Sequence, residues 1–134
     1  MKLTSTLPML VVDDIAACIG FYKSTLEYAV KHEIKDANGK LTWVLLSHGD
    51  NSVMMVERAN LDAEIAPYLK GPGASYLFHS MDPLDVDRVT KEDGVKVLHG
   101  PRATQYHVKE VHVMDVSGHM HMFIEWVKMD GLKG

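Results

Sequence analysis

The sequence predicts an α+β fold made of two βαβββ modules within a single domain of 134 residues. The order strand, helix, strand, strand, strand can be traced twice along the chain from its apolar patterns. Equivalent positions recur after about 68 residues, half of the chain: Asp14 and Asp82 each precede a predicted helix, and Met55 and Met122 lie in the last strands. A repeat of this kind indicates an internal duplication.

In the first module, an apolar run over residues 7–12 predicts a strand, and Asp14 offers an N-cap for the helix that follows. Apolar side chains then recur at helical spacing, which predicts a helix over residues 14–26. The Asn38–Gly39 pair is a strong signal for a hairpin turn. The remaining strands of this module are expected at residues 28–34, 41–47 and 52–57.

A linker is expected between the modules, and residues 61–69 within it could form a short helix that Pro67 limits. The single domain over residues 1–134 therefore divides into three parts. These are module 1 over about residues 5–58, the linker over about 59–73, and module 2 over about 74–128.

The second module repeats the order of the first. A strand is expected over residues 76–81, and Asp82–Pro83 is interpreted as an N-cap followed by proline at the first helical position. The helix is expected over residues 84–93, where Gly94 ends it. The last strands are expected at residues 95–98, 110–114 and 119–127.

Composition narrows the class of protein. Hydrophobic residues make up 46% and charged residues 24% of the chain, as in a soluble globular protein. The net charge of −4 without a basic block argues against nucleic acid and anionic membranes as partners. The single cysteine, Cys18, excludes a disulfide framework and favours the cytoplasm. We find neither a signal peptide nor an apolar run of membrane-spanning length.

Three motifs resemble the glyoxalase / bleomycin-resistance / extradiol-dioxygenase superfamily, also called the vicinal oxygen chelate proteins. They are LVVDDIAACIGFYKSTLEY near the start, TWVLLSHG in the third expected strand, and KEVHVMDVSGHMHMFIE near the end. The resemblance covers roughly residues 7–127, with Glu27 and Val116 where the family usually has glycine and proline. It implies two modules with curled mixed sheets, whose concave faces form a pocket, and usually a homodimer with pockets at its interface.

The resemblance also implies where a metal would bind in metal-dependent members. Those positions fall on Leu7, Met55, Tyr76 and Met122. None of the four is a normal ligand for a hard divalent cation, which prefers histidine or carboxylate. We therefore expect a metal-independent member of the family without a cofactor, and keep a divalent metal as the alternative.

Two polar groups of the last strands are candidates for chemistry. His119, His121 and Glu125 share one face of the last strand and could together hold zinc, although the family places this face toward the helix. Structural or surface histidines are the alternative. Glu110 and His112 are expected to face the concavity, where they could act as orienter and base or hydrogen-bond a ligand. The alternative for this pair is a solvated edge at the mouth of the sheet.

An apolar set supplies the expected ligand pocket, because aromatic rings and thioethers suit a flat or bulky organic molecule. The alternative is that these side chains form core and dimer interface. The set is Met9, Trp43, Met55, Tyr76, Tyr106, Met120, Met122 and Trp126.

Two functions follow. The first is a metal-independent binding protein that resembles bleomycin-resistance proteins and sequesters a bulky organic compound or antibiotic in an apolar pocket at a dimer interface. The alternative is a glyoxalase-like lyase or isomerase. It would use an atypical metal set from His112, His119, His121 and Glu125, or metal-free acid–base catalysis by Glu110 and His112. Whether the modules pair within one chain or are swapped between two stays open.

Overall fold

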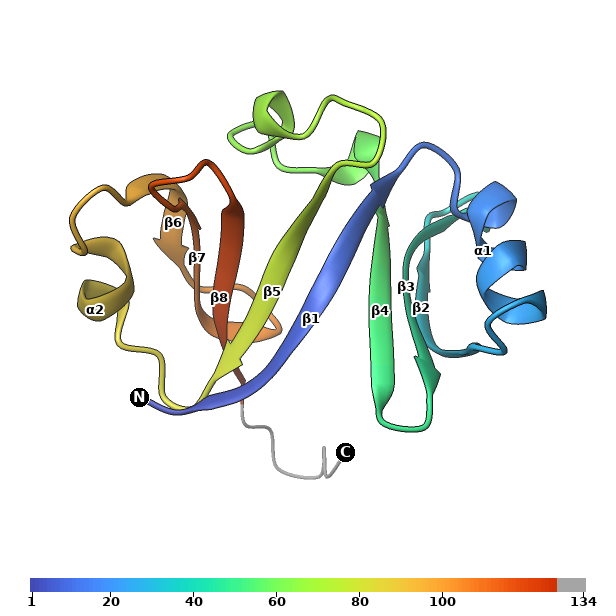
Figure 1. The fold of residues 1–134 in the computed structure, drawn as a ribbon, viewed down its shortest axis with the longest axis horizontal. Helices are drawn as coiled ribbons and strands as arrows, with labels where there is room; N and C mark the ends of the chain where they lie inside the picture. Colours follow the sequence, from blue (N-terminus) through green and yellow to red (C-terminus); the bar gives the residue numbers. More distant parts are fainter. Residues whose placement is uncertain (128–134) are drawn as a thin grey trace. The chain divides into compact units, whose positions relative to one another are not determined.

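The computed structural model describes residues 1–127 and contains the β-α-β-β-β order twice (Figure 1). The first set is β1 (Leu3–Val12), α1 (Ile15–Ser24), β2 (Ala29–Lys35), β3 (Leu41–His48) and β4 (Asn51–Glu57). The second set is β5 (Ser75–Met81), α2 (Val86–Thr90), β6 (Lys96–Arg102), β7 (His107–Met114) and β8 (Met120–Trp126). This confirms the α+β fold; the expected end of module 2 at residue 128 lies outside the described residues.

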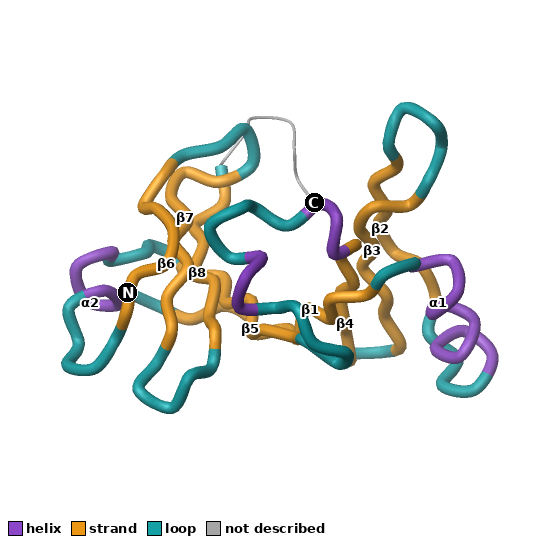
Figure 2. The backbone as a smooth tube through the Cα atoms, turned by 90° about the horizontal axis from the view of Figure 1, so that it is seen from above, coloured by secondary structure: helices purple, strands orange, loops and turns teal. Residues whose placement is uncertain are grey.

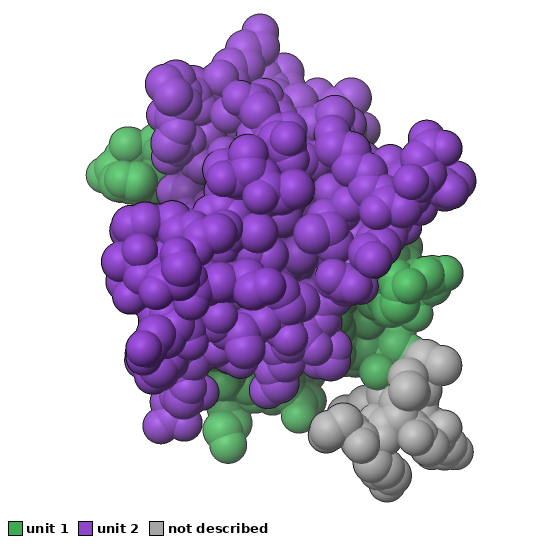
Figure 3. Space-filling model, turned by 90° about the vertical axis from the view of Figure 1, so that its right-hand side faces the viewer, with its two compact units in different colours: residues 1–6, 77–134 green, residues 7–76 purple. Residues whose placement is uncertain are grey.

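Strands dominate the chain and helices are few, as the orange and purple segments of Figure 2 show. None of the helices among the described residues is long and apolar enough to cross a membrane. The chain forms two compact units, coloured in Figure 3. Unit 1 comprises residues 1–6 and the chain from Leu77 onward, and unit 2 comprises residues 7–76.

In unit 2 the strand order is β2-β3-β4-β1, with antiparallel pairs except for the parallel pair of β1 and β4. Helix α1 packs on one face through Ile15, which is fully buried. Alternate strand residues point to this helix because successive side chains of a strand lie on opposite faces. The buried partners of Ile15 are Val44, Leu46, Val53 and Met55.

In unit 1 the strand order is β5-β8-β7-β6, and the first residues of β1 lie beside β5. The Thr4 hydroxyl donates to the Ser80 carbonyl (3.0 Å), and the Asp82 N–H donates to the Lys2 carbonyl (2.9 Å). Strands β5 and β8 are parallel, and the other pairs are antiparallel. The apolar core on the α2 side contains Met81, Leu84, Val111 and Val113, with Val86, Val89 and Phe123 packed against it.

The strand registers correct one equivalence between the modules. Met9 of β1 is opposite Met54 of β4, whereas Phe78 of β5 is opposite Met122 of β8. The residue equivalent to Met122 is therefore Met54 and not Met55. A shift of one residue moves a side chain to the other face of a sheet, and Met55 accordingly lies in the core against α1.

In each unit a glutamate carboxylate of the last strand accepts from a backbone amide at or just before the helix; Glu57 is buried and Glu125 is half-buried. The Ile15 N–H donates to Glu57 Oε2 (3.0 Å) in unit 2. The Leu84 N–H donates to Glu125 Oε1 (2.8 Å) in unit 1. Asp14 is the N-cap residue of α1, as expected, but its side chain makes no capping hydrogen bond. Glu57 satisfies the first helical amide in its place.

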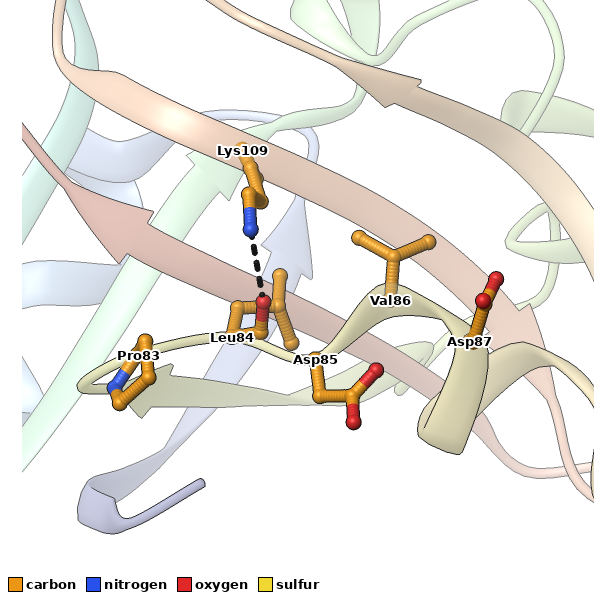
Figure 4. A pocket seen from close by; sticks show the side chains of 6 residues that line it. All are labelled: Pro83, Leu84, Asp85, Val86, Asp87 and Lys109. Atoms are coloured by element: carbon orange, nitrogen blue, oxygen red, sulfur yellow. Dashed lines mark hydrogen bonds between the residues drawn. The ribbon is translucent and has the colours of Figure 1, made fainter.

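A lysine side chain also takes part in each of these two contacts. Lys40 Nζ lies 3.0 Å from Glu57 Oε1, and Lys109 Nζ donates to the Leu84 carbonyl at 3.1 Å (Figure 4). The paired positions 15 and 84, 40 and 109, and 57 and 125 are separated by 68 or 69 residues. The internal repeat therefore includes specific polar contacts as well as the order of the elements.

Two predicted helices differ from the structure. Helix α2 is shorter than the expected 84–93, and it begins after Asp85, whose side chain accepts from the Arg88 N–H (3.2 Å). Asp82–Pro83 therefore precedes the helix and does not cap it. In place of the short helix expected at residues 61–69, the structure has a 3₁₀ turn, Ala66–Tyr68, and another 3₁₀ turn, Arg58–Asn60, precedes this range.

The Arg58 side chain holds this linker. Its Nε lies 2.8 Å from Asp13 Oδ1 in an ion pair. Its two terminal nitrogens donate to the carbonyls of Leu69 and Gly71. One guanidinium thus connects the end of β1 to the far end of the linker within unit 2.

The substitution Glu57→Ala is expected to lower the free energy of unfolding by about 1–3 kcal/mol, because it leaves the buried Ile15 amide without its acceptor. Asp14→Ala is the matched control and should change stability by less than about 0.5 kcal/mol, since the Asp14 side chain caps nothing. Urea denaturation of both variants measures the difference. Equal losses in the two variants would contradict the role of Glu57.

Candidate functional site

The face of the unit 1 sheet that points away from α2 carries buried polar residues beside an apolar floor. Glu110 is opposite Ile124 and His112 is opposite Met122 in the β7–β8 pair, while Val111 and Val113 pack toward α2. This confirms the expected faces of β7. Glu110 and His112 are 3% and 2% exposed, so the solvated edge pair that was the alternative is excluded.

Glu110 is the centre of a polar cluster on this face. Arg102 Nε donates to Glu110 Oε1 (3.0 Å), and His107 Nδ1 lies 3.8 Å from Glu110 Oε2. The rings of His99 and His112 are 5.7 Å apart between centroids. Burial alone would raise the pKa of Glu110, but the hydrogen bond from His107 and the charge of Arg102 together hold it below its ordinary value. Glu110 is therefore an ionised carboxylate that the protein itself neutralises.

An aromatic corner adjoins the polar cluster. The ring centroid of Trp126 lies 4.7 Å from that of His107, nearly perpendicular to it, and 6.1 Å from that of Phe78. The indole N–H donates to the Ser80 hydroxyl (2.9 Å), which fixes the plane of the ring. Trp126 is 48% exposed, so part of an oriented aromatic surface is open to a ligand.

The other predicted residues of unit 1 lie around this corner. Met120 and Met122 are buried on the same face of β8 and form its apolar floor together with Ile124. Tyr106 is 57% exposed in the loop between β6 and β7, and its carbonyl accepts from the N–H of Val127, just after β8.

The predicted residues of unit 2 are placed differently. Met9 and Tyr76 are buried, and Trp43 is half-buried. Met9 and Trp43 occupy strand positions that alternate with the α1-facing residues, so they lie on the face away from α1. Met55 is fully buried in the core against α1, and its placement lends no support to a ligand contact.

The histidines of the last strand enter a different arrangement from the expected zinc set. His121 Nε2 lies 2.8 Å from Asp115 Oδ2, and His121 Nδ1 lies 2.9 Å from His79 Nε2. The side chain of His119 is exposed, and Glu125 is occupied by the Leu84 amide.

The second proposed metal set fails for a geometric reason. His121 is opposite Val113, which packs toward α2, whereas His112 is on the other face of the sheet. His112, His119, His121 and Glu125 therefore do not come together. Among the described residues there is no group of three or more histidine, cysteine, aspartate or glutamate side chains that could hold a metal ion.

The donor chemistry at the positions implied by the resemblance gives the same result. With Met54 in place of Met55, these positions carry a leucine, two methionines and a tyrosine. Thioethers are soft ligands and do not fit the hard divalent cations of a metal-dependent member. The residues present do not fit such a metal.

An open pocket beside the start of α2 was not expected from the sequence (Figure 4). It is lined by Pro83, Leu84, Asp85, Val86, Asp87 and Lys109. Two of its charged side chains hold backbone groups, because Lys109 donates to the Leu84 carbonyl and Asp85 caps α2. We therefore assign it a structural role in fixing this end of the helix.

Sequence reasoning missed His99 and Arg102 because a strand was expected to end at Leu98, before Gly100–Pro101, and it missed His107 because the next strand was expected to begin only at Glu110. Strand β6 instead continues to Arg102 with shifts of register. Gly100 makes this possible: its φ is +85°, and a Cβ there would lie 2.6 Å from the Glu110 carbonyl oxygen. Polar residues on both sides of Gly100–Pro101 were the available signal for a strand that passes through an irregularity.

Comparisons with known proteins agree with this fold. The model of the family described as Glyoxalase/Bleomycin resistance protein/Dioxygenase superfamily matches residues 4–123. No curated protein matches the chain significantly in sequence.

Among solved structures, a glyoxalase/bleomycin resistance protein/dioxygenase superfamily member from Vibrio splendidus 12B01 has 20% identity and a TM-score of 0.61, with 92% of this chain and 99% of that chain covered. Methylmalonyl-CoA epimerase from Mycobacterium tuberculosis has 21% identity and a TM-score of 0.67, with 94% and 90% covered. A protein from Staphylococcus aureus has 12% identity and a TM-score of 0.68, with 93% and 98% covered. At these identities the likeness concerns the fold.

The substitution Arg102→Gln is expected to raise the pKa of Glu110, because it removes the cation that favours the ionised carboxylate. A lowered carboxyl pKa stabilises the fold at neutral pH, and this stabilisation is lost as the pH falls through the folded-state pKa. The variant should therefore lose less stability on acidification than the wild type. Carboxyl ¹³C NMR titration measures the pKa directly.

The matched control is Arg88→Gln, which removes an arginine of α2 that is on the other side of the sheet. It should leave the titration of Glu110 unchanged. An unchanged Glu110 pKa in Arg102→Gln would show that the ion pair does not set the charge of the site.

Proposed function

The chain belongs to the Glyoxalase/Bleomycin resistance protein/Dioxygenase superfamily, and on this premise we propose that it is a metal-independent protein that binds a bulky organic compound. The observation that carries the proposal is the aromatic corner of Trp126, His107 and Phe78 beside the buried methionines of β8. In this role the protein sequesters its ligand in an apolar pocket.

The aromatic corner supports a ligand with a flat ring. Trp126 is anchored by its N–H on Ser80 and still exposes about half of its surface, so a ring can stack on it without further ordering of the indole. The buried Met120 and Met122 add an apolar floor that adapts to irregular shapes. Rigid aromatic and adaptable thioether surfaces together suit a large apolar molecule with few specific polar groups.

The state of Glu110 favours binding over acid–base catalysis. In the lyase or isomerase alternative, His112 would be the base and Glu110 would orient it. The carboxylate of Glu110 instead accepts from Arg102 Nε (3.0 Å) and lies 3.8 Å from His107 Nδ1, and these two neighbours lower its pKa. A carboxylate held in this way by Arg102 and His107 is better suited to a fixed polar group of a binding site.

The donor chemistry supports independence from metal. The positions that would hold a metal carry leucine, methionine and tyrosine, and the acidic residue of β8 closest to the site, Glu125, points to the α2 side and accepts from Leu84. Binding would then depend on apolar contact and ring stacking. Such binding persists in a chelator.

Ligand binding is expected to raise the melting temperature in the presence of EDTA. We would screen bleomycin and flat cationic or anionic dyes by thermal shift, since a ligand at 100 times its Kd stabilises a protein by about 2.7 kcal/mol. The chain has two tryptophans, Trp43 and Trp126. A bound ring should quench Trp126, so quenching should survive in Trp43→Phe and disappear in Trp126→Phe.

Stabilisation that appears only after addition of a divalent metal would contradict metal independence. Quenching that is lost in Trp43→Phe and retained in Trp126→Phe would move the site away from unit 1. Elemental analysis of protein purified without chelator completes the test, because near-stoichiometric bound metal would also overturn the proposal.

We further propose that the protein is a homodimer in the cytoplasm and that its ligand site lies at the dimer interface, where it would serve resistance to a toxic compound or antibiotic. Large apolar side chains that remain exposed near the aromatic corner support this: Tyr106, Val108 and Trp126. Such side chains often mark an interaction surface when they gather.

Light scattering should therefore give a mass twice the 15.0 kDa of one chain. A double substitution, Tyr106→Glu with Val108→Glu, should halve that mass because it places charge in the proposed interface. Circular dichroism confirms that the variant remains folded. A wild-type mass of one chain at the concentrations that bind ligand would refute the dimer and leave the binding test intact.

A further inference from the structure

A continuous chain of polar side chains crosses unit 1 on the side of the sheet that faces α2. It starts at Asp115 in the turn before β8 and passes through His121 of β8 and His79 of β5 to Thr6 of β1. The three links measure 2.8 Å (Asp115 Oδ2 to His121 Nε2), 2.9 Å (His121 Nδ1 to His79 Nε2) and 2.8 Å (His79 Nδ1 to Thr6 Oγ1). The His79 ring also stacks on Phe123 at 4.8 Å, which holds it in place.

The carboxylate of Asp115, at one end of this row of side chains, determines which ring nitrogens of the two histidines carry a proton. Asp115 is a carboxylate, because hydrogen bonds from His121 and from the turn backbone lower its pKa to about 2. It can only accept, so His121 Nε2 carries a proton. In neutral His121 the Nδ1 then accepts, which requires a proton on His79 Nε2. His79 Nδ1 in turn accepts from the Thr6 hydroxyl.

Charge at His79 itself is disfavoured. Burial, reinforced by the proximity of His121, lowers the pKa of His79 to about 4. His79 is therefore neutral at physiological pH and keeps its lone pair directed at the Thr6 oxygen. A proton taken from Thr6 can move on through His79 to His121, where the Asp115 carboxylate stabilises the positive charge.

We propose that Thr6 is a nucleophile that accepts acyl groups from activated esters. A hydroxyl, a base within hydrogen-bond distance and a third group that orients the base are the parts of an activated nucleophile. Thr6 is exposed, so an acyl donor can reach it. The site is on the opposite face of the sheet from the aromatic corner, so it is independent of the proposed binding function.

The reaction balances with an aryl ester as the only co-reactant. Thr6 Oγ forms a bond to the acyl carbon while its proton moves to His79 Nδ1. The proton on His79 Nε2 moves to His121 Nδ1, which makes His121 an imidazolium against Asp115. The bond between the acyl carbon and the aryl oxygen breaks, and the aryl oxide leaves with that electron pair. His121 then releases its proton to the aryl oxide or to solvent.

The test uses the full chain and p-nitrophenyl acetate. Acetylated residues are mapped by peptide mass spectrometry over time, and we expect an acetyl group on Thr6. Thr6→Ser should retain acetylation at position 6, and Thr6→Val should abolish it. His79→Phe keeps a stacked ring but removes the base, and should slow acetylation of Thr6 by about 10²–10⁴-fold. Thr25, exposed at the end of α1, supplies the rate of an ordinary threonine.

A second variant, Asp115→Asn, keeps the test decisive if His79→Phe does not fold. Asp115→Asn keeps the Oδ1 that accepts from the turn amides of Ser117 and His119 but removes the charge behind His121. It should also slow Thr6 while leaving the acetylation of surface lysines unchanged. Acetyl groups on amines only, or Thr6 acetylated at the same rate in wild type, His79→Phe and Asp115→Asn, would overturn the proposal.

Discussion

The hydrogen bond between a glutamate carboxylate of the last strand and a backbone amide at or just before the helix is the contact on which each unit of this fold depends. A strand that leaves a sheet for a helix exposes backbone N–H groups at the very point where the chain becomes buried. Glu57 and Glu125 supply the acceptors from the last strands, β4 and β8. The same contact brings the last strand beside the first, so one interaction satisfies the backbone and selects the parallel pairing of these strands. Capping by the local residue, Asp14, would satisfy the amide without specifying the strand.

This contact divides each sheet into a structural face and a face that is free for ligands. Side chains in phase with the carboxylate pack against the helix, as Val53 and Met55 do in unit 2 and Phe123 does in unit 1. Side chains at the alternate strand positions, such as Met122, point to the other face of the sheet and do not pack against the helix. The polar residues of that face in unit 1 can then be arranged around Glu110, whose charge is neutralised by a neighbouring strand and not by solvent.

The element order and the two faces of β7 and β8 could be predicted from the sequence because they depend on local periodicity. Because successive side chains of a strand point to opposite faces, Glu110 and His112 share one face regardless of the rest of the fold. The partners of these residues could not be predicted in the same way. Arg102 reaches Glu110 only because β6 continues through Gly100–Pro101, a pair that ordinarily ends a strand.

The incorrect predictions for Met55 and Glu125 each have a specific cause. Met55 is one position away from the residue equivalent to Met122, because pairing the two gives an offset of 67 whereas the strand registers require 68, and a single step changes the face. Glu125 resembled a metal ligand because its carboxylate shares a face with two histidines, yet an amide of a distant loop already uses it. A carboxylate on a strand carries no local signal that distinguishes these roles.

The recurrence of the glutamate, the lysine and the amide in both halves has an evolutionary consequence. The polar contacts that build a half recur in both halves. The faces away from the helices differ: Met9 and Met54 lie there in unit 2, and Glu110 and His112 lie there in unit 1. The residues that build the fold and the residues that would select a ligand thus alternate along the same strands. New specificity can evolve by changing every second residue of one half, with the scaffold of both halves left as it stands.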